Sequence, residues 1–211
     1  MKYSDGRPVE IAFLIEISSK FPQMFLNEKG RTSVKNDGLM PSALSGPVLD
    51  FLMPKITLLG NGGAIWILAA LILLCTKKYR RQGVLLLVGL IAGVLVGNAC
   101  LKNLIARPRP CWLDSSVQLL IANLADYSFP SGHTLSSVIG ATGLTKTNRR
   151  FGYAAIPLAA LIAFSRLYLY VHFPSDVLAA AVLGVALGEL VWRCGGKLLE
   201  RWHAPRGRQR A

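Results

Sequence analysis

Three short groups of residues between positions 102 and 176 combine positive charge with imidazole rings. A lysine or arginine can hold a phosphate oxygen, and a histidine can attack phosphorus or move a proton. Brought together, the groups would form a basic pocket suited to phosphoryl transfer, in which negative charge spreads over three oxygens. They are Lys102 with Arg109-Pro110, then Pro130-Ser131-Gly132-His133, then Ser165-Arg166 with His172 and Asp176.

The chain that carries these groups is rich in apolar residues. Hydrophobic residues make up 52% of the sequence and charged residues only 17%, whereas roughly 25% of residues are charged in soluble proteins. The run over 56–76 holds no charged side chain, and a helix of that length crosses about 30 Å of hydrocarbon. The composition therefore predicts an integral-membrane protein.

Five apolar stretches are candidates for membrane spans. The third is rich in Ser, Thr and Gly, which suits a helix packed inside a bundle rather than one that faces lipid. If successive spans alternate in direction, the three motifs all fall on one side of the membrane. We expect an all-α, integral-membrane helical bundle with five to six transmembrane helices, five of them over 56–76, 83–105, 133–147, 152–171 and 176–195.

The first 55 residues differ from the rest, and residues 27–47 are rich in turn-forming Gly, Ser, Asn and Pro. An amphipathic pattern over 11–26 predicts a helix on the bilayer surface, with a poor first span as the alternative. Glu16 and Lys20 favour the surface, because each would cost about 2.5–3.5 kcal/mol at the bilayer centre. We expect an N-terminal region over 1–55, a transmembrane domain over 56–200 and a basic cytoplasmic tail over 201–211.

Basic residues lie in the connections after the first and third predicted spans and near the C-terminus. Such connections tend to stay in the cytoplasm, so we expect a multi-pass protein of the cell membrane with the three motifs on the extracytoplasmic side. This clustering also argues against nucleic acid as the partner of a chain with net charge +13. The residues are Lys77, Lys78, Arg80, Arg81, Lys146, Arg149, Arg150, Arg193, Lys197, Arg201, Arg206, Arg208 and Arg210.

In order and spacing, the three motifs resemble the signature of the type 2 phosphatidic acid phosphatase superfamily, which also includes vanadium haloperoxidases. The resemblance covers about residues 50–200, and the first 50 residues do not resemble the usual first transmembrane helix of six-span members. It implies a lipid phosphatase that works without a metal or other cofactor. The four cysteines are consistent with the absence of a metal, because they show no C-x-x-C spacing and predict neither a zinc site nor a disulfide framework.

The resemblance also implies roles for the motif residues. His172 would be the nucleophile that forms a phosphohistidine, and Asp176 would accept a hydrogen bond from its other ring nitrogen. His133 would protonate the leaving oxygen and then activate water. Cationic side chains and backbone N–H groups at a helix N-terminus would hold the phosphate. The phosphate-binding residues would be Lys102, Arg109, Ser131, Gly132 and Arg166.

The expected substrate is a lipid phosphate or diphosphate, with undecaprenyl diphosphate preferred on family grounds. Phosphatidic acid or phosphatidylglycerophosphate is the alternative, because nothing in the residues separates a prenyl tail from a diacylglycerol tail. A haloperoxidase is less well supported, since those members are soluble and larger. A lipid-phosphate binder or transporter would need the cations but no ordered nucleophile and acid. The sequence indicates no oligomeric state and no role for Arg107, Asp114 or Glu189.

Overall fold

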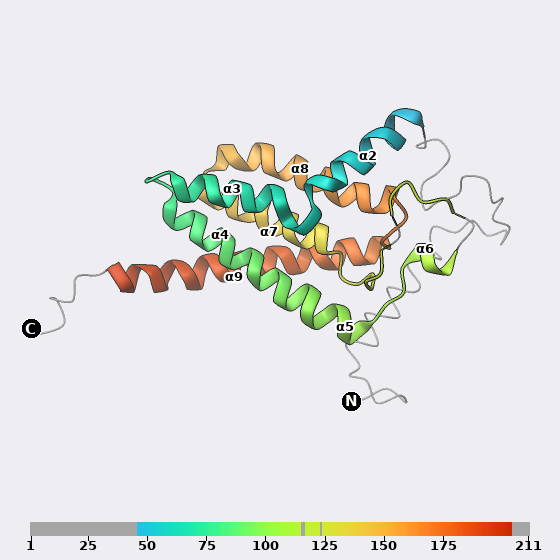
Figure 1. The fold of residues 1–211 in the computed structure, drawn as a ribbon. Helices are drawn as coiled ribbons and strands as arrows, with labels where there is room; N and C mark the ends of the chain where they lie inside the picture. Colours follow the sequence, from blue (N-terminus) through green and yellow to red (C-terminus); the bar gives the residue numbers. More distant parts are fainter. Residues whose placement is uncertain (1–45, 115–116, 123, 204–211) are drawn as a thin grey trace, which may run out of the picture.

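The computed structural model describes residues 46–114, 117–122 and 124–203, and every regular element in this part of the chain is a helix (Figure 1). The helices form one elongated bundle, so the all-α membrane bundle predicted from the sequence is confirmed. The surface helix predicted over 11–26 lies outside the described residues.

The first span is a broken helix. The chain bends by 44° between α2 (Pro47–Leu59) and α3 (Ala64–Cys75), across the short 3-10 turn η2 (Asn61–Gly63). Gly62 and Gly63 have φ angles of 58° and 73°, in the left-handed region that favours glycine. The sequence predicted one continuous span that starts at residue 56; instead, the helix starts at Pro47 and bends at this Gly-rich turn.

The second span is a helix of three consecutive parts. α4 (Arg80–Gly93) continues into the π-helical segment η3 (Val94–Leu101) and then into α5 (Lys102–Ile105). Ala106 ends the helix in a left-handed conformation with φ 47°. The chain then turns into the short helix α6 (Pro110–Leu113), for which Arg109 is the N-cap. The turn brings Lys102 and Arg109 to the same end of the bundle.

Three further helices complete the bundle: α7 (Gly132–Thr147), α8 (Arg149–Tyr168) and α9 (Pro174–His203). Within the described ranges, three helical segments are long and apolar enough to cross a membrane, and the bent α2–α3 pair makes a fourth if it counts as one span. The three segments cover 80–113, 149–168 and 174–198. α7, with 16 residues, is shorter.

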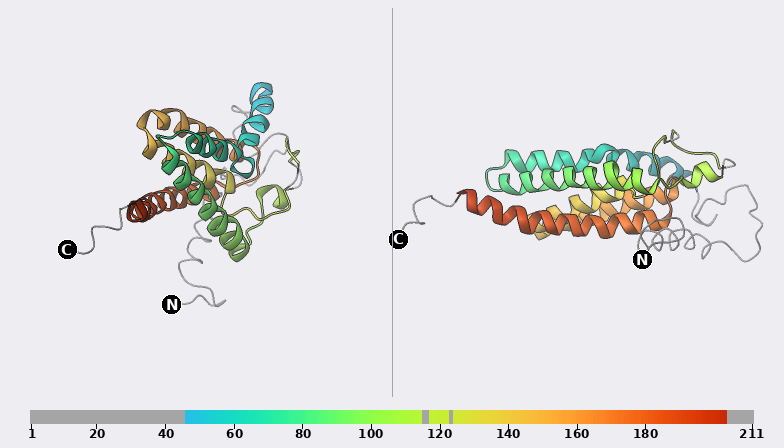
Figure 2. Two further views of the ribbon diagram at one scale, coloured as in Figure 1. Left: turned by 60° about the vertical axis from the view of Figure 1, so that its left-hand side comes forward. Right: turned by 90° about the horizontal axis from the view of Figure 1, so that it is seen from below.

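α7 is the inner helix of the bundle, and it packs against α4, α8 and α9 (Figure 2). Small residues allow the close approach, since a Cβ on Gly140 would lie 2.4 Å from the ring of Trp66 in α3. The Trp66 indole donates a hydrogen bond to the Ser137 hydroxyl at 3.0 Å. The Ser- and Gly-rich third stretch therefore packs inside the bundle, as its composition predicted.

The two ends of the bundle contain different elements. At one end, the α3–α4 turn, the α7–α8 turn and the last part of α9 lie together (Figures 1 and 2). There the rings of Tyr79 and Phe151 are 5.7 Å apart, and Lys146 pairs with Glu189 at 2.6 Å. The basic connections predicted to be cytoplasmic belong to this end. The opposite end holds α5, α6 and the α8–α9 connection, together with the start of α7, the end of α8 and the start of α9, and the motif residues lie there.

Candidate active site

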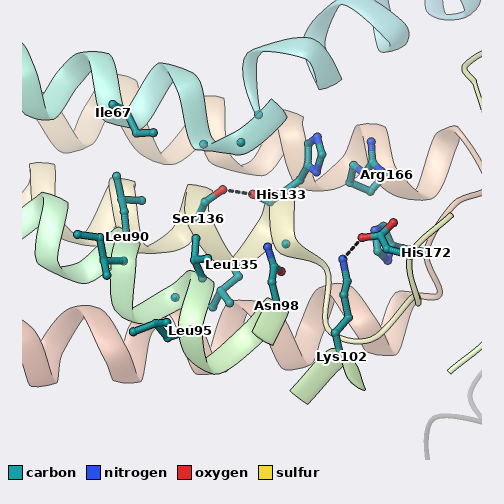
Figure 3. A pocket seen from close by; sticks show the side chains of 18 of the residues that line it. Ile67, Leu90, Leu95, Asn98, Lys102, His133, Leu135, Ser136, Arg166 and His172 are labelled. Carbon is teal, nitrogen blue, oxygen red and sulfur yellow. Dashed lines mark hydrogen bonds and ion pairs between the residues drawn. The ribbon is translucent and has the colours of Figure 1, made fainter. Parts of the chain in front are cut away.

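The three motifs meet at one cavity of about 460 Å³ (Figure 3). Its walls come from the α2–α3 turn and the start of α3, from α4 to α5, from the chain between α5 and α7, from the start of α7, and from α8 with the segment that follows it. Two of the predicted residues, Ser131 and Asp176, are fully buried outside the lining. The predicted residues that line the cavity are Lys102, Arg109, Gly132, His133, Arg166 and His172.

Arg109 is almost fully buried, with 1% of its surface exposed, and backbone carbonyls fix its guanidinium. Nε donates to the carbonyl oxygen of Asp126 at 2.7 Å, and Nη1 donates to that of Val171 at 2.8 Å. Nη1 also lies 3.2 Å from Nε2 of His172. Because a guanidinium can only donate, this contact assigns the unprotonated nitrogen of His172 to Nε2.

The opposite ring nitrogen of His172, Nδ1, faces Ser128 and Asp176. The Ser128 hydroxyl oxygen lies 3.3 Å from Nδ1, and the hydroxyl donates to Oδ2 of Asp176 at 2.5 Å. Nδ1 and Oδ2 themselves are 3.7 Å apart. The sequence led us to expect a direct hydrogen bond between imidazole and carboxylate, but the structure places a serine hydroxyl between them. Both contacts of the ring fit a proton on Nδ1.

The surroundings of His172 keep its ring neutral. The residue lies in the connection between α8 and α9. Burial lowers its pKa, and although Asp176 opposes the effect, the nearby cations Arg166 and Arg109 add to it, which brings the pKa to about 4. A neutral imidazole is the form that can act as a nucleophile.

The carboxylate of Asp176, in the first turn of α9, has two further partners. Nη1 of Arg107 pairs with Oδ1 at 2.6 Å, and the backbone N–H of Phe173 donates to Oδ2 at 2.9 Å. Arg107 also donates to the Ser175 hydroxyl at 2.9 Å, and its guanidinium lies 3.8 Å from the centre of the Phe173 ring. Arg107, which the sequence left without a role, therefore holds the carboxylate that faces His172.

Asp126 binds two cations of the cavity. Its Oδ2 forms an ion pair with Nζ of Lys102, and its Oδ1 pairs with Nη2 of Arg109 at 2.7 Å. Burial tends to raise the pKa of Asp126, but the hydrogen bond from Lys102 and the charge of Arg109 outweigh burial and lower the pKa to about 2. The carboxylate is therefore ionised throughout the physiological pH range.

Arg166 is buried in α8 and keeps one donor unused. Its Nη1 donates to the hydroxyl of Thr57, in α2, at 2.6 Å. Its Nε is buried and has no hydrogen-bond acceptor among the residues that the structure describes. A buried N–H without an acceptor is unfavourable. The oxygen of an anionic ligand in this cavity would supply one.

The ring of His133, the second imidazole, is held by the turn that breaks the first span. Its Nε2 lies 2.8 Å from Oδ1 of Asn61, a carbonyl oxygen that accepts an N–H from the ring. Gly60 permits this approach, because a Cβ there would lie 2.7 Å from Cδ2 of His133. The bend between α2 and α3 therefore orients His133.

The start of α7 uses its polar groups within the protein. Ser131 is the N-cap, and its hydroxyl oxygen accepts the backbone N–H of Thr134 at 3.5 Å. The backbone N–H of Ser131, which the sequence assigned to phosphate binding, donates to the carbonyl of Asp176 at 3.3 Å. Gly132 lines the cavity close to Asn98, whose Oδ1 would lie 3.0 Å from a Cβ at this position.

Four polar residues at the site were not singled out from the sequence. Asp126 and Ser128 lie just before the Pro130 motif, and this proximity was the signal that could have found them. Thr57 and Asn61 lie within the uncharged run over 56–76, and no motif or charge there marked them as site residues. Across the described ranges, no three His, Cys, Asp or Glu side chains are grouped so that they could hold a metal ion.

The cavity also has an apolar part. In Figure 3, Ile67, Leu90 and Leu95 lie on the side away from Arg166 and His172. A cationic pocket that continues into an apolar space suits a ligand with an anionic head and a hydrocarbon chain. The other apolar lining residues include Leu87, Ile91, Val94 and Leu135.

Comparisons with known sequences identify the family. Residues 82–200 match the model of the PAP2 superfamily. An undecaprenyl-diphosphatase from Sulfolobus acidocaldarius is 34% identical over 121 residues, which are 57% of this chain and 58% of that protein. The undecaprenyl-diphosphatase BcrC from Bacillus subtilis is 31% identical, over 69% of this chain and 75% of that protein. Phosphatidylglycerophosphatase B from Bacillus subtilis is also 31% identical, over 69% of this chain and 74% of that protein.

Two solved structures share the fold. A transmembrane PAP2 type phosphatidylglycerolphosphate phosphatase from Bacillus subtilis has a TM-score of 0.62 and 24% identity, and the match covers 90% of this chain and 98% of that one. Aquifex aeolicus LpxE has a TM-score of 0.64 and 28% identity, over 72% and 89% of the two chains. This protein is thus a multi-pass membrane protein that belongs to the PAP2 superfamily, and the resemblance seen in its motifs is confirmed.

Proposed function

We propose that this protein is a lipid phosphatase that removes the terminal phosphate of a membrane lipid, with undecaprenyl diphosphate as the preferred substrate. The proposal is carried by the convergence of Lys102, Arg109 and Arg166 with two imidazoles at one end of a cavity that is apolar at the other. Relatives named undecaprenyl-diphosphatase in an archaeon and a bacterium support the diphosphate. The similarity to phosphatidylglycerophosphatase B makes phosphatidylglycerophosphate or phosphatidic acid the second candidate.

In the first step of the proposed reaction, Nε2 of His172 attacks the terminal phosphorus and the bond to the leaving oxygen breaks. His133 gives a proton to that oxygen, so that a lipid diphosphate leaves as the lipid monophosphate and a lipid monophosphate leaves as the alcohol. The imidazolium that forms on His172 keeps its proton on Nδ1. Ser128 and Asp176 stabilise this charge through the contacts described above.

In the second step, water attacks the phosphohistidine. His133 takes a proton from the water, and the P–N bond breaks so that its electron pair returns to Nε2 of His172. Inorganic phosphate is the product. In both steps Lys102, Arg109, Arg166 and the backbone at Gly132 would stabilise the negative charge on the phosphoryl oxygens. Because these groups supply the charge compensation that a metal ion gives in other phosphatases, we infer that the reaction is metal-independent.

We also infer the orientation of the protein and the extent of its phosphatase domain. The basic residues at the α3–α4 and α7–α8 turns favour a cytoplasmic location for that end, so we infer that the cavity lies on the extracytoplasmic side. We assign the phosphatase domain to 56–200, which includes Thr57 and Asn61, the residues that contact Arg166 and His133. The basic tail over 201–211 is assigned to the cytoplasm.

The test is phosphate release by the purified protein in detergent, with a chelator present. The panel contains undecaprenyl diphosphate, phosphatidic acid and phosphatidylglycerophosphate, and we expect fastest release from the first. His172→Ala should abolish release, whereas His203→Ala, which changes the histidine at the end of α9, should not. Full activity of His172→Ala would contradict the nucleophile. Activity that needs an added metal would contradict metal independence, and binding without turnover would identify a lipid-phosphate binder or transporter.

A further inference from the structure

A carboxylate of the protein itself occupies part of the cationic pocket. Asp126 contacts both Lys102 and Arg109, two of the residues proposed to bind phosphate. Its side chain is 54% exposed and lines the cavity, so it lies where a ligand can reach it. The side chains of Lys102 and Arg109, in contrast, are 10% and 2% exposed. An anion that enters the cavity therefore meets these two cations already paired.

The contacts of Arg109 show what an entering phosphate must displace. Its Nε and Nη1 donate to the backbone carbonyls of Asp126 and Val171, which are fixed parts of the site. Its Nη2 donates to Oδ1 of Asp126 at 2.7 Å and, more weakly, to the carbonyl of Tyr127 at 3.3 Å. Nη2 can donate its full hydrogen bond to a phosphate oxygen only after the Asp126 carboxylate has moved away from Arg109. Nε of Arg166, by comparison, has no acceptor to lose within the described part of the chain.

We propose that Asp126 is a specificity-determining residue: its carboxylate is an internal anion that the substrate head group must displace, and it thereby selects terminal phosphates over phosphodiesters. This inference rests on the proposed function. The ion pairs of Asp126 with Lys102 and Arg109 carry it.

The selection follows from charge. A phosphodiester carries one negative charge, so its exchange for a carboxylate brings no additional attraction to Lys102 and Arg109. A terminal phosphate carries up to two negative charges and three free oxygens, so the same exchange gains both charge and hydrogen bonds. Because Asp126 is part of the chain, it competes at a constant effective concentration. The phosphodiester head groups of the surrounding bilayer are thus excluded, and the inorganic phosphate product is helped to leave.

The test compares two soluble inhibitors of the full-length protein in detergent, inorganic phosphate at pH 8 and dimethyl phosphate. The variants Asp126→Asn and Asp126→Ser remove the charge, and Asp126→Glu keeps it. Asp50→Asn is the matched control, because it also removes a carboxylate but one that binds the Tyr168 hydroxyl at 2.6 Å and does not line the cavity. Inhibition constants are measured against lipid turnover. Binding is measured independently from the rise in Tm when each inhibitor is added.

We expect both neutral variants to bind inorganic phosphate about tenfold more tightly than wild type, a modest change because the displaced carboxylate is half exposed. Dimethyl phosphate should gain more, so that the ratio of the two inhibition constants shrinks. Asp126→Glu and Asp50→Asn should resemble wild type. Weaker or unchanged phosphate binding in both neutral variants would show that Asp126 positions the cations instead, and would overturn the inference. A wild-type protein that binds phosphate but hydrolyses no lipid phosphate would contradict the proposed function alone.

Discussion

Arg109 and His172 are in contact through the ring nitrogen that we assign to attack on phosphorus. Nη1 of Arg109 lies 3.2 Å from Nε2 of His172, and the carbonyl of Val171 holds the same Nη1 at 2.8 Å. The guanidinium therefore covers the lone pair of the nucleophile. A phosphoryl group that binds beside Arg109 would take over this hydrogen bond and expose the lone pair to phosphorus. In the proposed reaction, Arg109 would thereby align the substrate with His172.

The first prediction concerns the hydroxyl between His172 and Asp176. Ser128→Ala removes the acceptor of the Nδ1 proton and leaves Asp176 without one donor. We expect kcat to fall about 10- to 100-fold, the cost of a lost buried hydrogen bond of about 1–3 kcal/mol. KM should change little, because Ser128 does not line the cavity. Steady-state kinetics in detergent separate the two constants.

Two variants control for this change. Ser128→Thr keeps the hydroxyl and should recover most of the activity. If Ser128→Ala lowers kcat only through a change in packing, Ser128→Thr should not restore it. Thr76→Ala removes a hydroxyl at the other end of the bundle, where it donates to the carbonyl of Ile72, and should leave both kinetic constants unchanged.

The second prediction is that His172 stays neutral far below the pH at which an ordinary histidine becomes charged. Burial and the nearby arginines lower its pKa to about 4, from an ordinary value of about 6.5. Between those pH values the unfolded chain takes up a proton that the folded chain does not, so folding stability decreases as the pH falls through this window. NMR titration of protein labelled with nitrogen-15 histidine, assigned with His172→Gln, reads the protonation directly. A midpoint near 6.5 would contradict the low pKa.

The third prediction concerns the unused donor of Arg166. Lysine keeps the charge but cannot both bond Thr57 and present a second N–H to a phosphate oxygen. We expect Arg166→Lys to lower kcat/KM about 100-fold, as the loss of one fixed donor to a transition-state oxygen does. Arg150→Lys, at the exposed start of α8, is the matched control and should retain wild-type kinetics. Retained kinetics in Arg166→Lys would mean that Nε does not contact the substrate.

The fourth prediction tests the close approach of Gly60 to His133. A Cβ at residue 60 would lie 2.7 Å from Cδ2 of His133 and 2.9 Å from Cγ2 of Ile162. We expect Gly60→Ala to destabilise the fold by about 1–3 kcal/mol through overpacking and to lower kcat by displacing the His133 ring. Gly196→Ala, where no atom lies within 4 Å of the added Cβ, should change neither. Unfolding in detergent and kinetics measure the two effects.

Much of the architecture could be predicted from the sequence, because each motif lies at a recognisable end of an apolar stretch. Lys102 ends an apolar stretch, His133 begins one, and Arg166 lies near the end of the next. When helices alternate in direction, these three positions fall at one end of the bundle, and the cavity is lined by all three. The small residues of the third stretch likewise predicted an inner helix, because only small side chains permit the contact of Gly140 with Trp66.

Other parts of the site could not be predicted, since they depend on backbone conformation and tertiary contacts that have no sequence period. Gly60 and Asn61 lie within an uncharged run, and the lack of charge says nothing about the bend that brings Asn61 to His133. Asp126 and Ser128 lie in a loop, where spacing does not determine which groups they face. The N–H of Ser131 was assigned to an anion, but only the folded chain shows that the carbonyl of Asp176 takes it.

The bend between α2 and α3 also divides the site between two parts of the chain. Thr57 and Asn61, which hold Arg166 and His133, precede residues 82–200, the stretch recognised as the family's own. All three signature motifs lie inside that stretch. A chimera in which residues 47–63 come from a related protein would replace Thr57 and Asn61. It would thus give Arg166 and His133 new neighbours without the replacement of a single motif residue. By this route the preference for one lipid leaving group over another can change in evolution while the proposed nucleophile, His172, stays the same.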